Sequence, residues 1–200
     1  MLKTPFLKLS FSLFILLGLF LTTLPKEFFP DWLVLPLSGI GAFLFAFLML
    51  LPRIFYKTTM NTPLEKDQAI TKLQTYAAIG FLMSYGGTLG LFRLYLVGFP
   101  YDKLIHFIFP LLASIAIIEF LYYWYNRGVF YAAFYGLAAV LLIAIGWELA
   151  EYFSDLYLGT KSFGQLGTDF FRDTLWDGIL NVVGMTSGFY LAKKNIRNNP

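Results

Sequence analysis

The stretch LIHFIFPLLASIAIIEFLYYWY, residues 104–125, is an apolar run that contains one histidine and one glutamate. A helix needs about 20 such residues to cross ~30 Å of hydrocarbon. The whole chain has the same character, since 58% of its 200 residues are hydrophobic and only 14% are charged. This composition is too apolar for a water-soluble domain of this length and indicates an integral membrane protein.

Six apolar runs of this kind follow one another along the chain. They cover residues 6–24, 32–51, 75–98, 104–125, 129–153 and 174–192. The sequence therefore predicts an all-α fold, in which residues 1–200 form one integral membrane domain with about six transmembrane helices. The polar connection over residues 53–75 is too short to form a second domain.

Lysine and arginine are concentrated in the N-terminal segment, the 53–75 connection and the C-terminal tail. Because cytoplasmic segments carry the excess of these residues, we expect both termini and this connection to be cytoplasmic. The basic residues alternate with apolar runs, so membrane orientation explains them better than nucleic-acid binding does. We therefore expect a multi-pass protein of the cell (cytoplasmic) membrane, with the lipid bilayer as partner and no nucleic acid.

Polar side chains gather where the last three predicted helices reach the outer side of the membrane. They are Lys103, His106, Glu148, Glu151, Asp173, Asp177 and Asn181, and Arg93 lies in the run before them. A charge facing lipid inside the bilayer costs about 2.5–3.5 kcal/mol even on the gentler insertion scale. We therefore expect His106, Glu148 and Asp177 to face one another, with Arg93 and Lys103 as the partners of these acids.

In the last apolar run, 174–192, two glycines lie on the same helix face as Asp177 and Asn181. Gly184 and Gly188 have the spacing GxxxG, which lets another helix approach closely. This spacing predicts that Asp177 and Asn181 face protein rather than lipid.

Three motifs carry a resemblance to a known family. DKLIHF at 102–107, WELAEYF at 147–153 and RDTLWDGILNVVG at 172–184 resemble the VanZ-like group of small bacterial membrane proteins and its YjdF-type relatives. The resemblance covers roughly residues 85–190. Glu151 stands where VanZ-type sequences usually carry glutamine, which is closer to the YjdF-type pattern. Because the function of these groups is largely unknown, the resemblance implies a fold and no defined activity.

One histidine among carboxylates would suit a divalent cation held through oxygen ligands, or acid–base chemistry on a lipid headgroup. The substrate would be a lipid headgroup or a lipid-linked or other cell-envelope precursor. The candidate catalytic residues are His106, Asp177 and Glu148. The candidate substrate-binding residues are Arg93, Lys103 and Asn181. The candidate metal ligands are Glu148, Glu151, Asp173 and Asp177.

Two other functions stay open from the sequence, so it does not decide whether the protein is an enzyme. A small transporter or channel is supported by Glu119 alone, which lies about 20 Å deeper than His106 at ~1.5 Å per residue. A structural or partner protein would use the cluster as an internal ion-pair network. In that case Asp102 pairs with His106 four residues later, as helical neighbours do.

Overall fold

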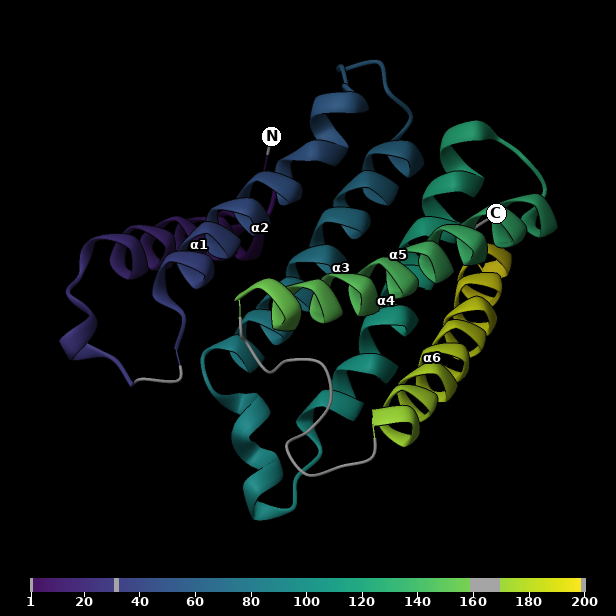
Figure 1. Ribbon diagram of the computed structural model, residues 1–200. Coiled ribbons are helices and arrows are strands. Elements are labelled where there is room, and N and C mark those ends of the chain that lie inside the picture. Colours follow the sequence, from purple (N-terminus) through teal and green to yellow (C-terminus); the bar gives the residue numbers. More distant parts are fainter. Residues whose placement is uncertain (1, 31–32, 159–169, 199–200) are drawn as a thin grey trace. The chain divides into compact units, whose positions relative to one another are not determined.

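The computed structural model describes residues 2–30, 33–158 and 170–198, and the regular elements in these residues are all helical. The prediction of an all-α fold is confirmed. The α-helices are α1 (Pro5–Thr23), α2 (Leu35–Phe55), α3 (Leu64–Thr88), α4 (Tyr101–Tyr125), α5 (Val129–Leu158) and α6 (Phe170–Asn198), and the 3-10 helices are η1 (Lys26–Phe28) and η2 (Leu91–Val97). Figure 1 shows their course.

Four of these helices are long and apolar enough to cross a membrane by themselves. They are α1, α2, α4 and the part of α5 from Val129 to Ser154. α3 and η2 make at most one further span, because they are bent by 56° at the break between them. α6 is not apolar enough to be counted among these spans, since acidic and amide side chains lower its mean hydropathy. The chain is thus a multi-pass helical protein, and a sixth crossing at 174–192 stays a prediction.

The structure differs from the sequence expectation around the third helix. α3 begins at Leu64, so the connection expected over 53–75 is helical in its second half. The charged residues there fit a helix because Glu65 and Asp67 lie in its first turn, where acidic groups complement the helix dipole. The apolar run at 75–98 is broken after Thr88, where Gly90 adopts a φ of 126°, a backbone region that glycine enters readily.

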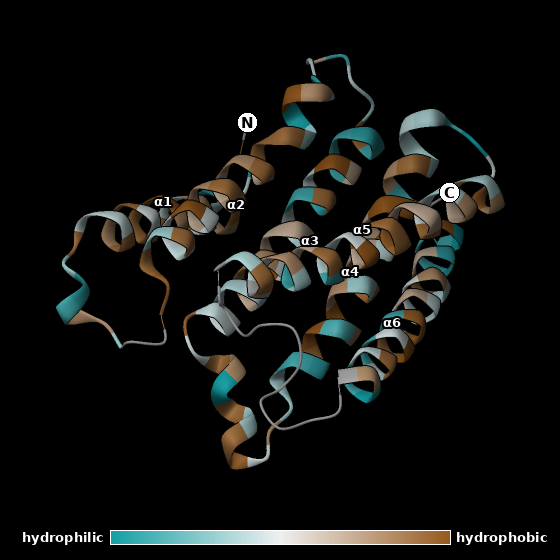
Figure 2. Cartoon of the chain, viewed as in Figure 1, coloured by the Kyte–Doolittle hydropathy of each residue, from teal (hydrophilic) through white to brown (hydrophobic). Residues whose placement is uncertain are grey.

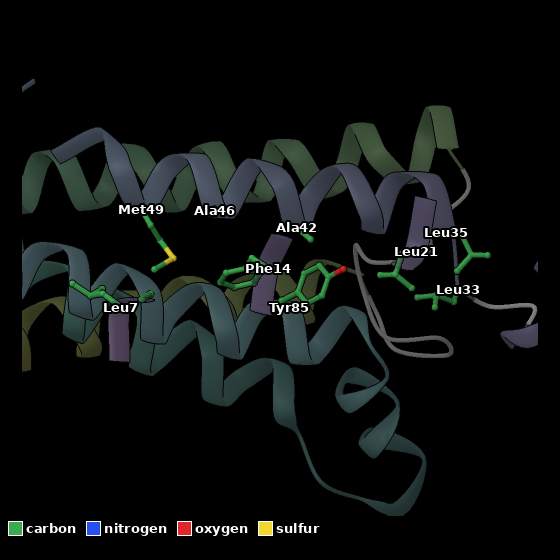
Figure 3. Close-up of a cluster of buried hydrophobic side chains, with 10 residues drawn as sticks. Leu7, Phe14, Leu21, Leu33, Leu35, Ala42, Ala46, Met49 and Tyr85 are labelled. Carbon is green, nitrogen blue, oxygen red and sulfur yellow. The ribbon is translucent and has the colours of Figure 1, made fainter. Parts of the chain in front are cut away.

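The chain forms two compact units, Met1–Arg93 and Leu94–Pro200, each with its own core. In the first unit, α1, α2 and α3 surround a cluster of buried side chains, most of which Figure 3 labels. The ring of Phe14 meets those of Phe45 and Tyr85 edge-on, with centroids 5.7 and 5.6 Å apart. The hydroxyl of Tyr85 donates to the carbonyl oxygen of Ser38 at 3.0 Å, so this buried phenol is satisfied. That the units form one membrane domain stays a prediction.

A buried arginine near the end of α2 is the second feature of this unit. Arg53 is only 6% exposed, and each of its guanidinium nitrogens has an acceptor. Nε donates to Gln74 at 3.0 Å, Nη1 to Thr58 and Asp67 at 2.8 Å each, and Nη2 to Thr71 at 2.6 Å. We call these five residues the Arg53 network.

In the second unit, α4 and α6 lie side by side, as Figure 1 shows. The glycine pair of α6 lies directly against the backbone of α4. A Cβ atom at Gly184 would collide with the carbonyl oxygen of Phe107, and one at Gly188 would lie 2.5 Å from that of Leu111. The expected close packing on this face of α6 is confirmed, and α4 is the partner.

A tight turn joins α4 to α5. Asn126 ends α4 in the left-handed conformation with a φ of 51°, which asparagine tolerates better than most residues. α5 then returns along α4, where Gly136 packs on Ile118. The apolar cluster between the three helices is formed by Ile118, Ala132, Ala133, Ala192 and Ile196. It lies at the end of the unit where α4 and α6 finish, which leaves the polar residues at the other end.

Candidate functional site

The ammonium group of Lys103, in the first turn of α4, joins α4 to α6. Its Nζ atom lies 2.6 Å from Asp173 Oδ1, 2.7 and 2.8 Å from the two carboxylate oxygens of Asp177, and 3.3 Å from Asp102 Oδ2. Asp173 and Asp177 are one helical turn apart and so share a face of α6. The expected pairing of Lys103 with Asp177 is confirmed. These ion pairs already balance the charge of Lys103, which leaves it less suited to bind an anionic substrate than its place in the sequence indicates.

His106 lies one turn further along α4 and is buried among carboxylates. Its Nε2 atom is 3.5 Å from Asp102 Oδ1 and 3.7 Å from Asp177 Oδ1. Its Nδ1 atom is 3.6 Å from Glu148 Oε1, which α5 contributes. The expectation that His106, Glu148 and Asp177 are neighbours is therefore confirmed, and three helices build the site.

The two glutamates of α5 complete the cluster and differ from each other in their partners. Glu151 Oε1 accepts a hydrogen bond of 2.7 Å from the indole nitrogen of Trp147, four residues earlier. Glu148 Oε1 is buried and has no hydrogen-bond partner in the described part of the chain. The sequence interpretation missed Trp147, although a tryptophan one turn from a glutamate could have indicated an indole donor.

We call these side chains the polar cluster. It consists of Asp102, Lys103, His106, Glu148, Glu151, Asp173 and Asp177. Five carboxylates face one ammonium group and one imidazole, so the formal charge is negative whether or not His106 is protonated. Charges that are buried without a counter-charge are costly. The cluster is therefore suited to take up positive charge, as protons or as a bound cation.

Within the described residues, two overlapping groups of side chains could hold a metal ion. In Asp102, His106 and Asp177, and again in His106, Glu148 and Glu151, the donor atoms lie within 4.8 Å of one another. In the first group, both oxygens of Asp177 already accept from Lys103. In the second, Glu148 Oε1 accepts no hydrogen bond among the described residues. The second group therefore fits a cation better, whereas Asp173, a predicted ligand, belongs to neither group and holds Lys103.

The other predicted site residues lie at the edge of the polar cluster or outside it. Asn181 is buried one turn beyond Asp177 on α6. Arg93 lies in η2 and belongs to the first unit, so its pairing with the cluster stays a prediction. Glu119 is 1% exposed and accepts a hydrogen bond of 2.7 Å from Asn195 Nδ2 of α6. The sequence alone indicates no partner for Glu119.

Comparison with known proteins places the chain in a family. A family model described as "Predicted membrane protein (DUF2238)" matches residues 8–194. Because this match spans nearly the whole sequence, the chain belongs to that family. No curated protein and no solved structure matches the chain. The family description supports the membrane fold, and the resemblance to VanZ-like and YjdF-type proteins stays a prediction.

Proposed function

We propose that this member of the DUF2238 family of membrane proteins binds the headgroup of a lipid, or of a lipid-linked cell-envelope precursor, at the polar cluster. One observation carries the proposal: the buried imidazole of His106 lies 3.5–3.7 Å from carboxylates of three helices, and one of these, Glu148, has an oxygen that accepts no hydrogen bond from the described residues. Ionisable groups at membrane depth are costly, so an incompletely paired set of them points to a ligand or a reaction.

His106 is the proposed acid–base group. A neutral imidazole donates from one ring nitrogen and accepts at the other, and here Asp102 faces Nε2 while Glu148 faces Nδ1. With acids on both sides, the ring can pass a proton between Asp102 and Glu148, or between either acid and a bound headgroup. Asp177 supports this role from α6, since it lies near the same Nε2 atom.

The remaining residues would position these groups. Lys103 holds Asp173 and Asp177 by its ion pairs and so fixes the α6 side of the polar cluster. Asn181, one turn beyond Asp177, is the proposed substrate contact in this unit. Arg93 belongs to the first unit, so its predicted role as a substrate contact stays a prediction.

A divalent cation suits this proposal for an electrostatic reason. Most lipid headgroups carry phosphate, which the excess carboxylates of the polar cluster would repel. With Nδ1 deprotonated, His106 joins Glu148 and Glu151 as donors that could hold a cation between the protein and a phosphate, and in that state it does not relay protons through Nδ1. Such an ion would polarise a phosphoryl oxygen and stabilise negative charge on it.

The distribution of lysine and arginine supports an outer position for this site in the cytoplasmic membrane. A transporter is a weaker alternative, because the bond to Asn195 gives Glu119 a structural explanation. A purely structural role for the polar cluster would leave the unpartnered oxygen of Glu148 unexplained.

Native mass spectrometry of the detergent-purified protein tests the proposal. We expect bound phospholipid or lipid-linked precursor on the wild-type protein, and at least a tenfold lower bound fraction for His106→Gln and Glu148→Gln. The matched control is Glu65→Gln, which removes one exposed carboxylate from α3 and should retain the lipid. Equal retention by all four proteins, each shown to be folded by its thermal unfolding, would refute the proposed binding site. If a cation bridges the headgroup, EDTA should lower retention by the wild-type protein as well.

A further inference from the structure

A group of basic residues gathers at the end of the second unit that lies away from the polar cluster. It consists of Arg127 in the turn after α4 and of Lys193, Lys194 and Arg197 in the last turns of α6. Figure 2 shows the hydrophilic colour of this end of α6. Among the described residues none of these four cations forms an ion pair. The acid on this part of α4, Glu119, is buried and bonded to Asn195.

Aromatic rings hold two of these cations in place. The Nζ atom of Lys193 lies 5.6 Å from the ring centre of Phe130 and 6.0 Å from that of Phe189. The guanidinium carbon of Arg127 lies 5.9 Å from the ring centre of Tyr131. These cation–π contacts restrict the long side chains without neutralising their charge. Binding of an anion would therefore cost less side-chain entropy.

An open pocket of about 540 Å³ lies on this surface. Its lining consists of Tyr190, Lys193, Lys194, Arg197 and Asn198. These side chains offer three positive charges, a hydroxyl group and an amide, and no carboxylate. Such a lining suits an anion with several oxygen acceptors, and a phosphate group is the commonest of these in a membrane.

An apolar surface adjoins the pocket. Phe130, which packs under Lys193, is 75% exposed, and Phe134, one turn further along α5, is 70% exposed. α5 is one of the helices apolar enough to cross a membrane, and where it crosses, this exposed strip would face hydrocarbon. An amphiphile whose headgroup lay in the pocket could therefore lay an acyl chain along α5. A soluble phosphate compound would leave this strip uncovered.

We propose that the pocket at the end of α6 is a binding site for an anionic phospholipid, with Lys193, Lys194 and Arg197 around the phosphate and Phe130 beside the first part of an acyl chain. Aromatic and basic side chains are enriched at the membrane interface, where such a headgroup lies. This site does not depend on the polar cluster or on the function proposed for it.

Lipid titration of the full-length protein in detergent, followed by native mass spectrometry, tests this site. The probes are phosphatidylglycerol and the zwitterionic phosphatidylcholine. We expect the wild-type protein to bind phosphatidylglycerol at least tenfold more tightly than phosphatidylcholine. The triple variant Lys193→Gln/Lys194→Gln/Arg197→Gln should lose this preference, and the milder variant Arg197→Gln should weaken it about threefold. Phe130→Ser should weaken binding with the three cations intact.

The control variant Lys8→Gln/Lys26→Gln/Lys57→Gln removes the same formal charge from the first unit and should bind phosphatidylglycerol as the wild-type protein does. Undiminished preference in the α6 triple variant would overturn the proposal, and so would equal loss in the control. Inorganic phosphate at millimolar concentration should not displace the lipid, whereas displacement would show a site for free phosphate. Because these residues are at the surface, an unchanged thermal unfolding midpoint should accompany each result.

Discussion

The Arg53 network and the polar cluster are both built from charged side chains between packed helices, and they differ in how completely those charges are paired. In the Arg53 network one cation meets one carboxylate, and the other acceptors are neutral amide and hydroxyl groups. In the polar cluster five carboxylates meet one ammonium group and one imidazole, and Glu148 Oε1 accepts no hydrogen bond from the part of the chain that the structure describes. The first set satisfies itself, whereas the second is incomplete without a further ligand or proton.

This difference is the one expected between a structural use of buried charge and the functional use proposed above for the polar cluster. Buried polar groups that only stabilise a fold are expected to be fully hydrogen-bonded, because each unmet group costs free energy. A set that keeps an unmet group retains that cost for another reason, and ligand binding is the usual one. Substitutions in the two sets should therefore change stability by different amounts, and the differences can be measured.

The largest loss of stability is expected for Arg53→Met. This change leaves Gln74 Oε1 without its donor and removes a bond from Asp67. Removing one partner of a buried ion pair costs about 3–5 kcal/mol. Because Lys3 still lies 2.7 Å from Asp67 and keeps that carboxylate paired, we expect a loss of unfolding free energy at the lower end of this range, about 3 kcal/mol. The measurement is the free energy of unfolding in mixed micelles of detergent and denaturant.

Arg53→Lys is the matched control for that measurement. Lysine keeps the charge but lacks the planar fork that reaches several acceptors, so it should restore only part of the loss. If Arg53→Met were as stable as the wild-type protein, the Arg53 network would not be needed for stability, and its contrast with the polar cluster would fail.

An intermediate loss is expected for Asn195→Leu. The substitution removes the amide that donates to buried Glu119, and losing such a bond costs about 1–2 kcal/mol. The double variant Glu119→Leu/Asn195→Leu replaces both partners with apolar groups and should recover part of that loss. Additive losses in a double-mutant cycle would contradict the pairing of Glu119 with Asn195.

The smallest effect, with the opposite sign, is expected for Glu148→Gln. The glutamine side chain has nearly the same shape as that of glutamate. It removes one negative charge from the polar cluster, which has an excess of carboxylates, and adds a hydrogen-bond donor near His106. We expect unfolding free energy to be unchanged or to rise by about 0.5–1 kcal/mol, as often happens when a functional residue is replaced. A loss of more than about 1 kcal/mol would instead give Glu148 a structural role like that of Arg53.

The helices themselves could be predicted from apolar run length, because the bilayer fixes how long a spanning helix must be. The start of α3 could not, since its polar first turns have the composition of a loop. Hydropathy responds to burial in lipid and not to backbone hydrogen bonding, so it does not detect a helix that begins in polar sequence.

Part of the polar cluster could also be predicted, because the cost of exposing His106, Glu148 or Asp177 to lipid leaves inward convergence as the favourable arrangement. The partner of Glu119 could not be predicted in this way. Asn195 is 76 residues away and lies beyond the run at 174–192, in a segment expected to be a tail. It meets Glu119 because α6 continues to Asn198, in a register set by the contact of Gly184 and Gly188 with α4.

The attachment of α5 gives the second unit a mechanical property. Near its start α5 packs closely, since a Cβ atom at Gly136 would lie 2.7 Å from the side chain of Ile118. In the other half of α5 the side chains of Leu149 and Phe153 are exposed, and Glu148 Oε1 lies 3.6 Å from His106 Nδ1. Glu148 lies about 18 Å along the helix from Gly136 at ~1.5 Å per residue, so a tilt of ~10° about the packed end would carry it about 3 Å. Because the ion pairs between α4 and α6 do not involve Glu148, such a tilt would change only the α5 side of the polar cluster.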